Sequence, residues 1–103
     1  MTLYAQPHAE GAPVAFKARY DNFIGGRFVP AADGRTFDVI TPITGQVFTQ
    51  AARSGERDIE LALDAAHAAA AKWAATSPAE RANILLKIAD RIEQNTERLA
   101  YAE

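Results

Sequence analysis

Residues 76–80, Thr-Ser-Pro-Ala-Glu, divide the second half of the chain into two helices. Ser77 suits the N-cap, Pro78 suits the first helical position, and Glu80 suits the position three residues after the cap, which together form a capping box. Proline inside a helix removes a hydrogen bond and clashes with the preceding turn, so a continuous helix through this point is disfavoured. The sequence therefore predicts one helix over about 55–75 and another over about 78–103.

Apolar residues repeat at the helical period in both segments. Ser54 is the predicted N-cap of the first helix, and the acidic residues that follow suit the positive end of the helix dipole. The faces are formed by Ile59, Ala62, Leu63, Ala66, Ala69, Ala70 and Trp73 on the first helix, and by Ile84, Leu85, Ile88, Ile92, Asn95 and Leu99 on the second. We expect the two helices to pack on each other through Ile59, Leu63, Ala66 and Trp73 of the first and Ile84, Leu85, Ile88 and Ile92 of the second.

Two leucines break these patterns. Leu61 lies on the far side of the first helix and Leu86 on the far side of the second, so an isolated pair of helices would leave both uncovered. The second helix also reaches Glu103 without a glycine or another C-cap signal. We therefore expect further structure to cover these leucines and the chain to be a piece of a longer protein.

Residues 20–53 alternate short β-prone runs with turn signals. Gly25-Gly26 lies between two such runs, which indicates a primed two-residue hairpin turn, because both positions tolerate positive φ. A phosphate-binding loop is the alternative for these glycines, but a third glycine at the required spacing and a directly following helix are both missing. Pro42 and Gly45 predict a chain reversal between the last two runs. We expect a meander of short antiparallel strands here.

Residues 1–19 show no sustained period, so we expect a mobile N-terminal arm. This stretch lacks the basic start and apolar run of a secretory signal and contains Glu10, which argues against a transit peptide. The expected location is the cytoplasm. The expected fold class is α/β, with short antiparallel strands followed by two amphipathic helices.

The overall charge and composition exclude several classes of partner. A net charge of −2 gives no reason to expect nucleic acid binding, and 49% hydrophobic with 23% charged residues indicates an ordinary globular protein and no membrane span. The chain has no cysteine, which rules out disulfides, thiolate metal sites and a cysteine nucleophile within it.

The remaining polar side chains do not form a catalytic arrangement. His8 and His67 are far apart in sequence, and His67 falls at the flank of the first helical face, where packing at the solvent edge is expected. The acidic residues that open the first helix could suggest a cation site, but the helix dipole explains them and we expect them all to face outward: Glu56, Asp58, Glu60 and Asp64. We expect no catalytic and no cofactor-binding residue in this chain.

The order of these features resembles the opening of the aldehyde dehydrogenase superfamily. The segments that carry the resemblance are Asn22–Val29, Thr36–Val47, Asp58–Ala66, Trp73, Arg81–Leu85 and Ile88–Glu93, and they resemble most closely the bacterial acetaldehyde and other short-chain aldehyde dehydrogenases. One residue departs from the pattern, because the family usually has asparagine before the proline of its Asn-Pro-x-Thr-Gly turn and this chain has Thr41. Threonine can also bond to the turn backbone, so we expect the turn to be kept.

The resemblance implies a longer enzyme that oxidises an aldehyde to a carboxylic acid with NAD or NADP. It makes residues 20–103 the start of the dinucleotide-binding domain, and it places the cysteine nucleophile, the glutamate base and the nicotinamide site beyond Glu103. It further implies a homodimer or homotetramer. A monovalent cation is implied at the positions of Val39 and Ile40, held by their backbone carbonyls with an acidic side chain from further along the chain.

A different class of function fits the same features less well. A free-standing interaction module, with a strand meander and a helical hairpin, would use Leu61 and Leu86 as a partner surface. The uncapped end of the second helix argues against it.

Overall fold

The computed structural model describes residues 3–103 and confirms a mixed α/β fold. The chain forms two units, one of Phe16–Ala69 and one that contains residues 3–15 and Ala70–Glu103. In chain order the elements are β1 (Arg19–Tyr20), β2 (Asn22–Ile24), β3 (Arg27–Val29), β4 (Thr36–Ile40), β5 (Val47–Ala52), α1 (Glu56–Ala74), α2 (Pro78–Gln94) and α3 (Thr96–Ala102). Within residues 3–103, none of the helices has the length and apolar content needed to cross a membrane.

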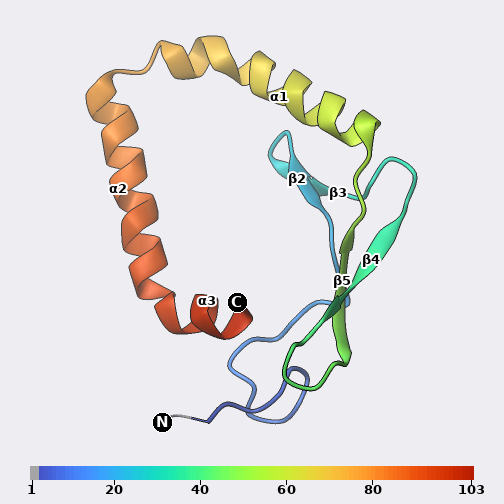
Figure 1. Ribbon diagram of the computed structural model, residues 1–103. Helices are drawn as coiled ribbons and strands as arrows, with labels where there is room; N and C mark the ends of the chain where they lie inside the picture. The colour runs from blue at the N-terminus through green and yellow to red at the C-terminus, as the bar shows by residue number, and fades with distance from the viewer. Residues whose placement is uncertain (1–2) are drawn as a thin grey trace. The chain divides into compact units, whose positions relative to one another are not determined.

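Strands β2 and β3 form a tight antiparallel hairpin (Figure 1). Gly25 and Gly26, which connect the strands, have φ values of 63° and 82°. Two successive positive φ values confirm the predicted primed turn. Phe23 and Phe28 are opposite each other in the register, with ring centroids 5.0 Å apart.

The remaining strands form a three-stranded sheet in the order β1-β5-β4. This arrangement differs from the expected single antiparallel meander in two ways. The hairpin β2–β3 is a separate sheet, and β1 pairs with β5 in parallel, with Arg19 opposite Gln50 and Tyr20 opposite Ala51. Turn residues report only on chain reversals between neighbouring strands, whereas the β1–β5 pairing joins segments about 30 residues apart, as the pair Arg19 and Gln50 shows.

The turn between β4 and β5 has the local bonding that the sequence predicts. The N–H of Ile43 donates to Oγ1 of Thr41 at 3.4 Å, and the N–H of Gly45 donates to the carbonyl of Thr41 at 2.9 Å. Gly45 has a φ of 71°, and Thr41 is buried. Threonine therefore takes the place of the usual asparagine in this turn.

The N-cap of helix α1 is one residue later than predicted. The carbonyl of Gly55 accepts hydrogen bonds from the N–H groups of Asp58 and Ile59, so Gly55 is the residue at the cap position. Ser54 instead donates its hydroxyl hydrogen to Oδ1 of Asn22 at 3.0 Å. The prediction of Ser54 as N-cap is therefore wrong, because this hydroxyl is bonded to the start of the hairpin.

The sheltered face of α1 in the Phe16–Ala69 unit is not the predicted one. Asp58 is buried and Leu61, Ala62 and Ala65 are partly buried, a spacing of i, i+3, i+4 and i+7 that defines one side of a helix. Ile59 and Leu63, on the predicted face, are 58% and 53% exposed. Leu61 thus belongs to the side of α1 that this unit covers, while the larger apolar stripe is left open.

Helix α2 begins as predicted, but the second helix does not continue unbroken to the end of the chain. Ser77 Oγ accepts from the N–H of Glu80, and the Glu80 carboxylate accepts from the N–H of Ser77, each at 3.1 Å. The helix breaks at Asn95, whose side-chain amide donates to the carbonyl of Arg91, and Thr96 donates to the carbonyl of Glu93. Both side chains compete with the backbone for helical acceptors, which the apolar period alone does not reveal.

The buried residues are few and mostly polar. Within residues 3–103 they are Ala31, Thr41, Thr49 and Asp58. Thr49 donates its hydroxyl hydrogen to the carbonyl of Lys17 at 2.6 Å, next to the contact of the Phe16 and Phe48 rings at 4.9 Å. Hydrogen bonds between buried polar side chains and the backbone therefore supplement the strand ladders, and the larger apolar side chains on α1, α2 and β4 stay largely exposed.

Candidate functional site

The described residues contain no constellation that could perform catalysis. Among residues 3–103, no group of three histidine, aspartate or glutamate side chains could hold a metal ion, and the sequence has no cysteine. His67 is exposed on α1, as are Glu56, Glu60 and Asp64. The expectation that the whole acidic group faces outward is wrong for Asp58 alone.

Asp58 is a structural carboxylate at the first turn of α1. Its Oδ1 accepts from the N–H of Ala32 at 2.8 Å, and its Oδ2 accepts from the N–H of Gly55 at 2.9 Å. The second bond is the reciprocal half of a capping box, in which an acidic residue three positions after the cap bonds back to the cap N–H. The first bond fixes the β3–β4 loop to α1. Asp58 thereby caps α1 and joins it to the β3–β4 loop.

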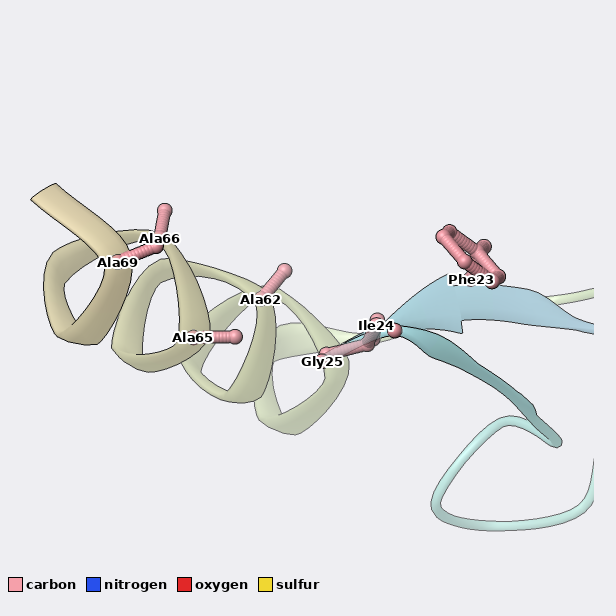
Figure 2. Close-up of a pocket in the computed structure, with 8 residues that line it drawn as sticks. Phe23, Ile24, Gly25, Ala62, Ala65, Ala66 and Ala69 are labelled. Atoms are coloured by element: carbon pink, nitrogen blue, oxygen red, sulfur yellow. The ribbon is translucent and has the colours of Figure 1, made fainter. Parts of the chain in front are cut away.

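An open apolar groove lies between the β2–β3 hairpin and α1 (Figure 2). Its volume is about 380 Å³. It is lined by small or apolar residues, namely Phe23, Ile24, Gly25, Gly26, Ala62, Ala65, Ala66 and Ala69. The alanines sit on the face of α1 next to the hairpin turn, so a neighbouring element could approach the helix backbone closely.

This groove can hold an apolar group but cannot transfer a proton. No titratable side chain is among its lining residues, so it offers neither a general acid nor a general base. A Cβ at Gly25 or Gly26 would meet nothing within 4 Å, so crowding does not require glycine there. The positive φ of both turn positions is what favours glycine. The groove therefore offers apolar contacts only.

Val39 and Ile40, the expected cation positions, lie at the end of β4 where the ladder is irregular. Val39 is opposite Thr49 and Ile40 is opposite Val47, so Phe48 is an extra residue on β5. A bulge of this kind disrupts the regular bonding of the strand pair and can turn a carbonyl away from the ladder. This geometry is compatible with carbonyl ligands, and the cation site stays a prediction.

Comparison with known proteins decides the family. The model of the aldehyde dehydrogenase family matches residues 28–103. The chain belongs to the aldehyde dehydrogenase family. Its relatives include an aldehyde dehydrogenase of Deinococcus radiodurans, 63% identical over 97% of this chain, and aldehyde dehydrogenase B of Escherichia coli, 58% identical over 95%. An acetaldehyde dehydrogenase of Pseudomonas aeruginosa is 56% identical over 98%.

The chain spans about a fifth of the length of these aldehyde dehydrogenases, with 19% of the Deinococcus protein and 20% of the Pseudomonas protein covered. It corresponds to the N-terminal segment of such an enzyme.

Solved structures share the fold. PnpE in complex with nicotinamide adenine dinucleotide matches 79% of this chain and 17% of its own, with a TM-score of 0.76 and 44% identity. HpcC from Thermus thermophilus matches 82% of this chain and 16% of its own, with a TM-score of 0.73 and 42% identity.

Proposed function

We propose that this chain is the opening segment of an enzyme that oxidises a short-chain aldehyde to a carboxylic acid with NAD or NADP. The observation that carries the proposal is the 63% identity to an aldehyde dehydrogenase over 97% of the chain. The NAD complex of PnpE supports a nicotinamide cofactor, and the relative named as an acetaldehyde dehydrogenase supports a small substrate.

In this enzyme the chemistry belongs to residues outside the segment. A cysteine thiolate would attack the aldehyde carbonyl, and a glutamate would activate the water that hydrolyses the thioester. The nicotinamide cofactor supplies the hydride acceptor. The present chain contributes a folded scaffold, in which Asp58 joins α1 to the strands and the alanine-lined groove offers a surface for close packing.

We also propose a monovalent cation at the carbonyls of Val39 and Ile40. Carbonyl oxygens are hard ligands suited to such ions, and the bulge in β5 opposite Val39 and Ile40, which interrupts the ladder there, supports the proposal. A higher melting temperature of the assembled enzyme in potassium chloride than in choline chloride at equal ionic strength would support the site. Equal melting temperatures in the two salts would argue against it.

The similarity to aldehyde dehydrogenases also supports a proposal about assembly and location. We propose a cytoplasmic homodimer or homotetramer. Light scattering coupled to gel filtration of the assembled enzyme would measure its mass, and a monomer would contradict this part of the proposal.

A chimera tests the activity directly. Residues 1–103 are joined to the remainder of the Deinococcus radiodurans relative, and NADH formation is followed with acetaldehyde and NAD. The intact relative is the positive control, and the remainder without the segment is the negative control. We expect aldehyde-dependent NADH from the chimera. A folded, soluble chimera without activity beside an active relative would overturn the proposal.

The free-standing interaction module is not favoured. The chain matches aldehyde dehydrogenases over 95–100% of its length, which leaves no part of it for a separate module.

A further inference from the structure

The N-terminal residues are bonded to α3 by two tyrosines that reach in opposite directions. Tyr4 donates its hydroxyl hydrogen to Oε1 of Glu97 at 2.8 Å, and Tyr101 donates to the backbone carbonyl of Ala5 at 2.6 Å. The two rings meet edge to face with centroids 5.7 Å apart. Glu97 and Tyr101 are four residues apart on α3 and so lie on the same side of that helix.

The segment that follows these contacts is folded into turns. The N–H of Ala9 donates to the carbonyl of Gln6 at 3.0 Å, and the N–H of Ala12 donates to the carbonyl of Ala9 at 3.1 Å. Pro7 is followed by His8 with a φ of 68°, which is the pattern of a type II turn with proline at its second position. The expected mobile arm therefore has local structure here, and its mobility stays a prediction.

Helix α3 is short enough to depend on such contacts. It has seven residues and is separated from α2 by the break at Asn95. Helices of this length are unstable in water unless other contacts hold them, because nucleation of the first turn costs more than a few hydrogen bonds return. The hydroxyls of Tyr4 and Tyr101 each supply a hydrogen bond between α3 and the N-terminal segment.

We propose that residues 3–5 act as a clasp on α3, fastened reciprocally by Tyr4 and Tyr101, so that the N-terminal segment and α3 become ordered and are released together. Residues 3–5 lie outside the part of the chain that the family model matches, which begins at residue 28. The hydrogen bond to the Glu97 carboxylate also raises the pKa of the Tyr4 phenol from its ordinary value of 10.0.

Hydrogen–deuterium exchange of the chimera, read by mass spectrometry, measures both partners of the clasp at once. Tyr4→Phe and Tyr101→Phe each keep the ring and remove only the hydroxyl. In either variant we expect faster exchange in residues 6–12 and in residues 96–102 together. The expected increase is about two- to tenfold, which corresponds to the net worth of one hydrogen bond. Exchange in the β2–β3 hairpin should not change.

Two controls separate the clasp from general unfolding. Tyr20→Phe removes a hydroxyl that accepts from the N–H of Lys17 in the other unit, and it should leave the exchange of α3 unchanged. Glu97→Gln keeps an acceptor for Tyr4 and should retain more protection than Glu97→Ala.

The chimera is used for these measurements because the rest of an enzyme supports the segment there. Unchanged α3 exchange in both tyrosine variants would overturn the clasp, and so would unprotected exchange of residues 6–12 in the unaltered chimera. Neither outcome depends on enzymatic activity, so the clasp and the proposed function can fail separately.

Discussion

The carboxylate of Asp58 accepts a hydrogen bond of 2.8 Å from the backbone N–H of Ala32, which ties the first turn of α1 to the loop between β3 and β4. A second bond from the N–H of Gly55 completes the use of both oxygens. Because Asp58 is buried, its removal would leave both N–H groups without their acceptor. Asp58→Ala should therefore lower the free energy of unfolding by about 2–4 kcal/mol.

Glu60→Ala is the matched control for this change. Glu60 is an exposed acidic residue on the same helix, and its ion pair with Arg57 lies in solvent. Its loss should cost less than about 0.5 kcal/mol. Urea unfolding of the chimera, followed by circular dichroism, compares the two. Equal unfolding midpoints would mean that Asp58 has no anchoring role.

Some local features of this fold could be predicted from the sequence, and its long-range contacts could not. The hairpin turn at Gly25-Gly26 and the capping box at Ser77 depend on a few adjacent residues, and both are confirmed. The parallel pairing of β1 with β5 and the bond from Asp58 to Ala32 join distant segments, so composition and period carry no signal for them.

The face of α1 shows why helical periodicity was insufficient. The period identifies the stripe with the largest apolar side chains, but it does not say which part of the protein covers that stripe. The Phe16–Ala69 unit shelters the side with Asp58 and Leu61 instead. Asp58 follows Gly55 by the spacing of a capping box, and this spacing is a sequence signal for the bond between them. The helix dipole explains an acidic residue at this position equally well.

The stability cost of substituting Gly26 in the hairpin turn should depend on the backbone conformation that the new residue prefers, and not on its size. Gly26 has a φ of 82°, and an added Cβ would meet nothing within 4 Å. Gly26→Ala should cost about 1–2 kcal/mol of stability, because alanine is strained in this region. Gly26→Asn should cost less, since asparagine adopts positive φ more readily. Equal melting temperatures for the two chimera variants would contradict this account of the turn.

The apolar face of α2 should matter more in the chimera than in the isolated chain. Ile88 is 49% exposed here, so Ile88→Ala should change the stability of the 103-residue chain only slightly. If its face is covered in the assembled enzyme, the same change should cost about 2–5 kcal/mol there. Gln94→Ala is the control and should be nearly neutral in both proteins. A neutral Ile88→Ala in the chimera would refute the predicted face.

Asp33 should titrate below its ordinary pKa. The backbone N–H of Arg35 is the largest cause of the lowered pKa of this carboxyl, and the Arg35 guanidinium adds to it. A lowered folded-state pKa contributes stability that is present above the ordinary value of 3.8 and is lost as the pH falls through the folded value. NMR titration of the side-chain carbon of Asp33 should give a midpoint below 3.8.

Arg35→Gln separates the two causes of this shift. The substitution keeps the backbone N–H and removes the guanidinium, so the pKa of Asp33 should return only part of the way to its ordinary value. A midpoint that does not move in this variant would show that the guanidinium contact at 2.6 Å does not form in solution.

The isolated 103-residue chain should have no dehydrogenase activity and should be at best marginally folded. It has no cysteine to form a thiohemiacetal, and no titratable side chain lines its groove. Ordering each residue costs about 1–2 kcal/mol, while apolar burial returns roughly 25 cal/mol per Å², and most of the large apolar side chains here stay exposed. We expect helical circular dichroism, a broad thermal transition, a tendency to associate, and no NADH with any short aldehyde. Turnover by the purified chain that is absent from an empty-vector preparation would contradict the assignment of the chemistry to residues outside this segment.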